Sequence, residues 1–191
     1  MAIDTGLLVG CTDLQAVGGI RQIIVTEMSN ISAVTAGSAH DYSALAALGC
    51  ARFEFRNESG SFTVNGTKEN GSTSFELGLS WYIPNMQGAA FLQLEKLQTG
   101  CIVAVVELTS GKKLVMGMSE AFGNNGVDSL TYARNQTFAT LSSIEGGSGS
   151  AYTDENGVTV SLTCKQYELP REYTAPGGIT VQPGDVTADL A

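Results

Sequence analysis

The stretch that decides the fold is KENGSTSFELGLSWYI, residues 68 to 83. Its second half places a large apolar side chain at every second position: Phe75, Leu77, Leu79, Trp81 and Ile83. Successive side chains of a β-strand point to opposite faces, so this period of two predicts a strand with one buried face. Turn-forming residues precede the run, and Pro84, which cannot continue a hydrogen-bonded ladder, follows it. We expect this strand at the centre of a sheet, with Trp81 in the core.

The composition favours a β-rich α+β protein. The 191 residues include 23 glycines, and only 15% are charged, which is unlike a helical bundle with a charged surface. With 43% hydrophobic residues, the chain is long enough for one buried core, and we expect a single domain over residues 1 to 170. Residues 171 to 191 contain little that could pack, so an extended C-terminal arm is predicted there.

Other segments fill in two packed antiparallel sheets, a β-sandwich with one flanking α-helix and long loops. Residues 86 to 98, opened by Asn85, carry apolar side chains at helical spacing, and a shorter helix is predicted from 41 to 48. Loops are expected over 28 to 40 and 57 to 72. The predicted strands cover residues 20–26, 51–55, 62–64, 72–83, 101–108, 112–118 and 158–164, the second to fourth of these forming a three-stranded meander.

The charge and the polar residues indicate no enzyme. The net charge of −9 argues against a nucleic-acid grip, which needs a basic surface. His40, the only histidine, has no Ser/His/Asp or Cys/His pattern around it. Cys11, Cys50, Cys101 and Cys164 are too widely spaced for a typical zinc site, and Cys101 and Cys164, which lie within apolar runs, are expected to be small buried hydrophobes. We predict no catalytic, cofactor-binding or metal-binding residue, and no membrane anchor, since no apolar run of about 18 residues occurs.

The order of these pieces resembles a known family. Cys11 and the Gly18–Ile20 segment lead into a strand, followed by ENGSTSFE at 69 to 76, a helix, a Ser-Gly hairpin and an Asn-Gly hairpin ending in YELP at 167 to 170. Over residues 11 to 170 the chain resembles virion proteins of tailed phages of Bacteroidetes-type bacteria, above all the major tail tube protein. In that family a two-sheet subunit joins its copies into rings through sheet edges, and the rings stack through loops and terminal arms.

The resemblance implies a virion structural protein, made in the bacterial cytoplasm, that forms a homo-oligomeric ring, hexameric by expectation, and a stacked tube with other tail proteins. Genomic DNA would pass through an acidic lumen without specific binding, because like charges repel. The candidate inter-subunit loop residues are Ser29, Asn30, His40, Glu58, Lys68, Glu69 and Asn70. The candidate arm contacts are Tyr173, Ile179 and Val181.

Two alternatives remain open at this stage. One is a different virion component, such as a head-to-tail connector, a tail terminator or a decoration protein. The other is a β-sandwich module for carbohydrate binding or adhesion, which would need exposed aromatic side chains, whereas Trp81 lies on the apolar parity of its strand. Self-assembly distinguishes a tube subunit from a monomeric binding module. A tube subunit exposes its sheet edges to its own copies, whereas a monomeric module protects its edges from pairing.

Overall fold

The computed structural model describes residues 18–36, 40–47, 50–54, 59–85, 88–98, 100–119, 137–151 and 156–174. Within these ranges the chain forms eleven strands, one α-helix and a short 3-10 helix at Met28–Asn30. The strands and the helix are β1 (Ile20–Glu27), β2 (Ile31–Ala36), β3 (Asp41–Ala47), β4 (Ala51–Glu54), β5 (Gly60–Glu69), β6 (Ser72–Pro84), α1 (Gly88–Leu97), β7 (Ile102–Leu108), β8 (Lys113–Met116), β9 (Thr140–Gly147), β10 (Gly157–Gln166) and β11 (Arg171–Tyr173).

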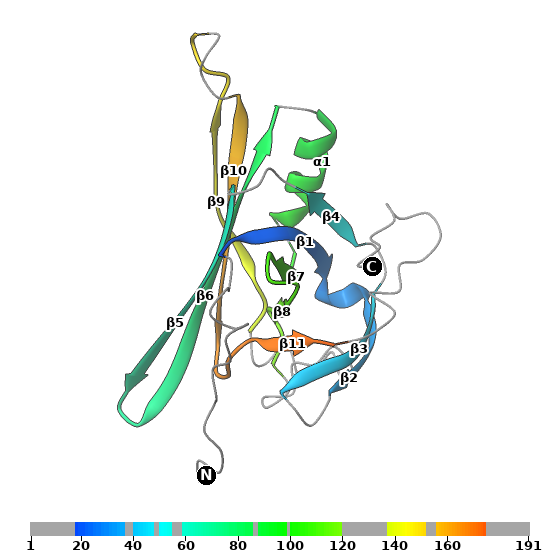
Figure 1. Cartoon of the computed structure of the whole chain (residues 1–191), viewed down its shortest axis with the longest axis vertical. Coiled ribbons are helices and arrows are strands. Elements are labelled where there is room, and N and C mark those ends of the chain that lie inside the picture. Colours follow the sequence, from blue (N-terminus) through cyan, green and yellow to red (C-terminus); the bar gives the residue numbers. More distant parts are fainter. Residues whose placement is uncertain are drawn as a thin grey trace.

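The predicted β-rich architecture of two sheets and one α-helix is confirmed. The larger sheet has the order β2-β3-β11-β8-β7-β1-β4, and the smaller has the order β5-β6-β10-β9. In Figure 1 the strands of the smaller sheet run along the long axis of the molecule, and the larger sheet lies to one side of it. Neighbouring strands are antiparallel except β11 and β3, which are parallel, so the larger sheet is mixed.

Strand β6 fulfils the prediction made from its sequence. It lies inside the smaller sheet, paired along its length with β5 and with β10. Leu77, Leu79 and Trp81 are at most 1% exposed, while the intervening side chains point to the other face. The alternation predicted for β10 is also found, because Val160 and Leu162 are buried and Thr159 is exposed.

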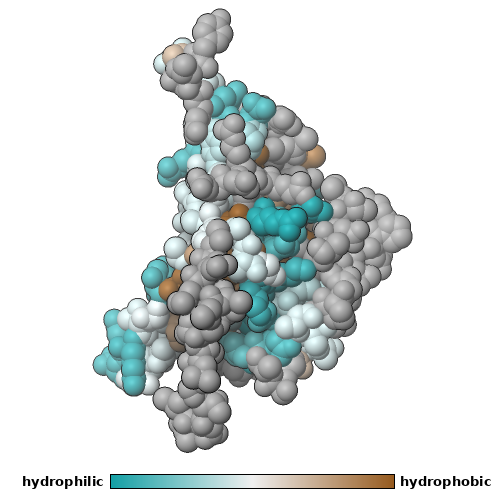
Figure 2. All heavy atoms as spheres, in the orientation of Figure 1, coloured by the Kyte–Doolittle hydropathy of each residue, from teal (hydrophilic) through white to brown (hydrophobic). Residues whose placement is uncertain are grey.

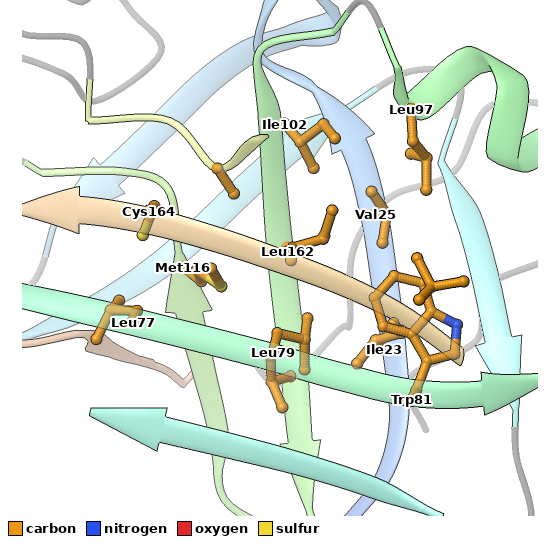
Figure 3. Packing of buried hydrophobic residues seen from close by; sticks show 14 of the residues in the cluster. Ile23, Val25, Leu77, Leu79, Trp81, Leu97, Ile102, Met116, Leu162 and Cys164 are labelled. Atoms are coloured by element: carbon orange, nitrogen blue, oxygen red, sulfur yellow. The ribbon is translucent and has the colours of Figure 1, made fainter. Parts of the chain in front are cut away.

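The core lies between the two sheets. Figure 3 shows the strand with Leu79 and Trp81 crossing the strand with Ile23 and Val25, with their side chains interdigitating. The Trp81 ring lies 5.5 Å from the ring of Phe53 on β4, in a tilted arrangement that adds to the apolar contact. Burial of these side chains is the main force holding the sheets together.

Strand β7 is covered on both faces, as its continuous apolar run predicts. Ile102, Ala104 and Val106 join the core between the sheets. Val103 and Val105 join a second apolar cluster on the opposite face of the larger sheet. Because both faces of β7 are buried, its sequence is apolar at successive positions and does not alternate between apolar and polar residues.

The strand predicted at residues 62 to 64 is confirmed as part of β5, but the loop predicted from 57 to 72 is otherwise wrong where it is described, because β5 and β6 form a hairpin with a two-residue turn. Asn70 and Gly71 both have positive φ, 49° and 84°, the geometry that an Asn-Gly pair adopts most readily. Gly66 gives space to the ring of Phe75, since a Cβ there would lie 3.1 Å from it. The outer half of β5 passes beyond the core and needs no apolar alternation, so sequence periodicity misses it (Figure 1).

The predictions for residues 28 to 48 are also wrong. The expected loop contains the 3-10 helix and β2, and the expected short helix is the strand β3. The cause is a β-bulge: Tyr42 pairs with Ala36 and Ala44 with Thr35, which inserts one extra residue into β3. Tyr42 and Leu45 therefore both become buried, and their spacing of three imitates a helix.

The predicted three-stranded meander does not form. Strand β4 pairs with β1 in the larger sheet, whereas β5 and β6 belong to the smaller sheet. The chain thus changes sheets between residues 54 and 60. Short alternating runs show that strands exist, but their alternation does not show which strands pair.

The folded domain continues beyond residue 170. Arg171–Tyr173 forms β11, inserted between β8 and β3, and Thr174 donates its backbone N–H to the Tyr42 carbonyl at 3.0 Å. Tyr173, expected as an arm contact, is buried in the second cluster of its own subunit. The boundary predicted at residue 171 therefore cuts through the larger sheet.

The predicted helix is present and is described from Gly88 to Leu97. It begins at Gly88, and Leu94 and Leu97 turn toward the core. Asn85 does not begin it: its φ is 61°, and its backbone N–H donates to the Asn156 carbonyl at 2.8 Å, which joins the ends of β6 and β10.

Candidate functional site

The described residues do not assemble a metal site or a reactive thiol. No group of three or more His, Cys, Asp or Glu side chains among them is close enough to hold a metal ion. Burial raises the pKa of Cys164 to about 12, and burial together with the carboxylate of Glu27 raises the pKa of Cys101. A thiol with a raised pKa is a poor nucleophile at neutral pH. Cys101 and Cys164 are free cysteines.

The polar groups that look most like catalytic candidates have structural partners. His40 Nε2 lies 3.0 Å from the Leu169 carbonyl, and the His40 carbonyl accepts the backbone N–H of Glu172 at 3.2 Å. The buried Glu107 carboxylate accepts a hydrogen bond from Gln22 Nε2 and one from Arg21 Nη1 at 3.4 Å. These contacts tie neighbouring strands together and account for the position of both side chains.

The most unusual surface is the outer face of the smaller sheet. The register aligns one serine from each of its four strands in a single row: Ser61, Ser80, Ser161 and Ser143. The two central serines are joined by a hydrogen bond of 3.3 Å from Ser161 Oγ to Ser80 Oγ. Trp81 and Val160, the sequence neighbours of Ser80 and Ser161, point to the opposite, buried face of the same strands.

A second row of this face carries threonines. Thr63, Gly78, Thr163 and Thr140 are aligned across the four strands. Gly78 leaves room for its neighbour, since a Cβ there would lie 2.7 Å from Thr63 Oγ1, and that hydroxyl donates to the Gly78 carbonyl at 3.4 Å. The two rows make the outer face a band of small hydroxyl groups.

Charge on this face is sparse and mainly negative. The charged side chains that the register places on it are Glu69, Glu76, Glu145 and Lys165, all exposed. Lys165 is the partner of Glu76 across β6 and β10. Toward the hairpin end, a hollow of about 570 Å³ is lined by side chains that include Thr67, Glu76, Lys165 and the exposed Tyr167.

The edges of the smaller sheet form the second feature. Within the described part of the chain, β5 and β9 each pair with a strand on one side only. Both edges carry an apolar residue of the inner face that remains open to solvent: Val64 on β5 is 39% exposed and Ile144 on β9 is 38% exposed. Open edges with apolar side chains are what a protein that acts alone usually avoids.

Helix α1 forms a groove beside the β9 edge. Phe91 and Leu92 point away from the core and are exposed. With Ile144 and the start of the helix they line a groove of about 380 Å³, which Glu95 and Gln98 border. A smaller cleft of about 110 Å³ lies on another side of α1, between Glu27, Asn30 and Lys96.

The residues predicted as inter-subunit contacts do not form one surface. Lys68, Glu69 and Asn70 lie together at the tip of the β5–β6 hairpin, which projects from the molecule and is hydrophilic at its end (Figures 1 and 2). Ser29 and Asn30 belong to the 3-10 helix. His40 lies beside β11. Glu58, Ile179 and Val181 fall outside the described residues.

Sequence analysis missed the hydroxyl rows and the apolar edges. The outward positions of β10, Thr159, Ser161 and Thr163, are visible in the sequence as a run of alternating hydroxyl residues. Their alignment with Ser80 depends on the register between strands far apart in the chain, which no local pattern encodes.

The fold and these surfaces define a β-rich, two-sheet protein whose smaller sheet has one apolar and one hydroxyl-rich face. Comparisons with protein-family models, with curated protein sequences and with solved structures find no match. The α-helix in the described ranges is too short to cross a membrane.

Proposed function

We propose that this chain is a structural subunit of a phage tail tube, assembled from copies of itself into rings that stack into a conduit for DNA. The observation that carries the proposal is the smaller sheet, whose two edges have no further partner strand among the described residues and whose outer face is rich in hydroxyl groups. The resemblance of the sequence to major tail tube proteins supports the same reading. The protein would reside in the virion with other tail proteins as neighbours.

The strand directions suit ring formation. The smaller sheet has four strands and every neighbouring pair is antiparallel, so its two edges, β5 and β9, run in opposite directions. A copy related by rotation about an axis along the strands therefore presents its β5 antiparallel to β9 of the first copy. Repeating this head-to-tail contact continues the ladder, and a closed ring leaves no free edge.

The chemistry of the outer face suits a lumen. A surface of serine and threonine side chains with three carboxylates and one lysine offers phosphate groups little to bind. Nonspecific DNA affinity comes from neutralising phosphates with Lys and Arg, and this face supplies little of either. DNA would slide past it without adhering. The hairpin tip with Lys68, Glu69 and Asn70 extends along the strand direction, toward an adjacent ring in this arrangement.

Assembly is the first test. The purified protein is examined by negative-stain electron microscopy and by light scattering over a range of concentrations. Hollow rings or tubes are expected. A monomer that persists at high concentration would count decisively against a tube subunit.

Charge placement tests the orientation of the sheet. The double variant Ser74→Lys with Thr159→Lys adds two ammonium groups to the outer face of β6 and β10. Its assemblies should retain duplex DNA that nuclease cannot digest, at low salt and less at high salt. The control, Ser29→Lys with Ser110→Lys, adds the same charge at exposed sites away from that face. Any DNA bound by the control should be digested; equal protection by both variants would refute the lumen assignment.

One observation favours a second candidate, a carbohydrate-binding module. The exposed ring of Tyr167 borders the hollow of about 570 Å³ together with carboxylate and hydroxyl side chains, a combination able to stack on and hydrogen-bond a sugar. Glycan-array binding by a monomer, abolished by Tyr167→Ala with the thermal midpoint unchanged, would support this candidate in place of the tube.

A further inference from the structure

We propose that α1 is a cover for the joint between two copies of this chain: Phe91, Leu92 and Ile144 of one copy receive Val64 from the β5 edge of the next. This inference rests on the proposed ring, and it names the surfaces and the partner. The partner is a second copy in a head-to-tail contact, and α1 is assigned a role beyond packing on its own subunit.

The inner apolar layer of the smaller sheet is exposed to solvent at both edges of the sheet. Across one row, Trp81 and Val160 are fully buried, whereas Ile144 at the β9 end is more than a third exposed. Across another, Leu77 and Cys164 are buried and Val64 at the β5 end is equally open. The inner-face side chains are buried in the middle of the sheet and exposed to solvent at its two edges. The opposite edge of a second copy would cover each of them.

Helix α1 is oriented so that Leu94 and Leu97 pack into the core between the sheets. Phe91 and Leu92 point away from it and lie with Ile144 around the groove of about 380 Å³. The helix therefore has apolar residues on two faces, and the described residues cover only one of them. The uncovered face lies beside the β9 edge, where a joining strand would add its side chains.

The occupant of the groove follows from the inner face of β5. Within one copy Ile144 lies in the row of Gly60, four residues along β5 from Val64. If β5 of a second copy pairs with β9 with a stagger of two to four residues, its inner-face residue Phe62 or Val64 lies next to Ile144. Any shift of register by an even number of residues keeps the apolar side of β5 toward the helix, while an odd shift would bring its hydroxyl side there. Lys68 follows on the same face of β5, and Glu95 of α1 borders the groove.

An isologous contact, in which two β9 edges pair, explains less. It would put two α1 grooves together and would leave Val64 open on both copies. It also stops at a dimer, whereas the β5–β9 contact uses both open edges. The two contacts predict different cross-links.

Cross-linking separates them. Val64 and Ile144 lie on opposite edges of one sheet and in rows that are four residues apart along the strands, so they are about 20 Å apart within one copy, and a shorter thiol-reactive reagent cannot join them there. Chains with Val64→Cys and chains with Ile144→Cys are prepared separately and mixed before assembly, with wild-type protein as the background for the native thiols. Covalent dimers are expected in the mixture and not in either variant alone.

A matched pair of leucines tests the role of α1. Leu92 and Leu169 are 55% and 50% exposed, so a glutamate at either position should leave the isolated subunit folded with a similar thermal midpoint. Leu92→Glu should raise the concentration needed for assembly at least about tenfold, since it places a charge in the joint. Leu169→Glu should leave that concentration unchanged.

The outcomes distinguish this inference from the proposed function. Rings that form without the mixed cross-link, or that tolerate Leu92→Glu, overturn the α1 joint and leave the tube subunit standing. Cross-links in Ile144→Cys alone indicate the isologous contact and also overturn it. Mixed cross-links in small oligomers that never become rings support the joint and count against the tube. A monomeric wild-type protein overturns both.

Discussion

The two faces of the smaller sheet share the same four strands and differ in almost every other respect. On β10, Leu162 is fully buried in the core, and Ser161, one residue earlier, lies in a row of serines on the opposite face. The inner face consists of large apolar side chains that interdigitate with the larger sheet (Figure 3). The outer face carries two rows of small hydroxyl groups, next to Tyr82 and to the charged side chains of Glu76, Glu145 and Lys165. The apolar packing of the inner face stabilises the fold of the subunit, whereas the residues of the outer face depend on what the subunit contacts.

The outer face is more uniform than folding demands. Exposed strand positions tolerate many residue types, and a typical protein surface mixes both signs of charge. Here two whole rows across four strands contain only serine, threonine and glycine. Since core packing does not impose that choice, we attribute it to what lies against this face, which in the proposed tube is DNA in transit.

The largest expected effect comes from truncating the inner face. Trp81→Ala should lower the free energy of unfolding by about 3–5 kcal/mol, because it opens a cavity under Phe53 and Ile23. Ser80→Ala, the adjacent outer residue, should cost about 1 kcal/mol or less. Urea denaturation followed by circular dichroism measures both values. Equal losses would contradict the division of roles between the two faces.

The same division explains how much of the fold the sequence predicts. Strands β6, β7 and β10 and helix α1 carry their own patterns, because each buries a regular set of side chains against the core. The outer half of β5 extends past the core and has no such pattern. In β3 the bulge near Ser43 makes a strand resemble a helix. Local periodicity reports burial, so it fails where burial is absent or a bulge shifts it.

The candidate site was less predictable than the fold. The hairpin tip around Asn70 could be read from the sequence as a turn. The serine row could not, since it joins Ser61 to Ser143 through three strand pairings set by tertiary structure. The role of α1 was hidden for a related reason: Phe91 and Leu92 look like core residues of an amphipathic helix until the position of the sheet is known.

A smaller effect is expected from alkaline pH, which acts on the inner face through Cys164. Burial raises the pKa of Cys164 to about 12, from 9.0 in the unfolded chain. Above pH 9.0 the unfolded state loses this proton first, so stability falls as pH rises, by up to about 1.4 kcal/mol per unit until the folded-state value is reached. Unfolding free energies measured between pH 8 and 11 should show this decline.

The variant Cys164→Ala is the control for that decline. Without the thiol, the slope above pH 9.0 should become shallower, although the starting stability is lower because of the lost side chain. A residual slope above pH 10.0 is expected from Tyr173, whose pKa burial raises to about 12. An unchanged slope in the variant would mean that ionisation of Cys164 does not cause the loss of stability at alkaline pH.

The smallest expected effect lies in the serine row, and it is the sharpest test of the comparison. The hydrogen bond of 3.3 Å between Ser161 and Ser80 is half-buried, so a double-mutant cycle with alanine at both sites should give a coupling of about 0.5–1 kcal/mol. Ser61 and Ser143, at opposite ends of the row, should show additive effects in the free subunit. A coupling above about 2 kcal/mol at the centre would exceed an ordinary neutral hydrogen bond and make the outer face a structural element. A coupling within the expected range leaves these hydroxyl groups almost dispensable for folding, and their regular alignment then needs an explanation outside the free subunit.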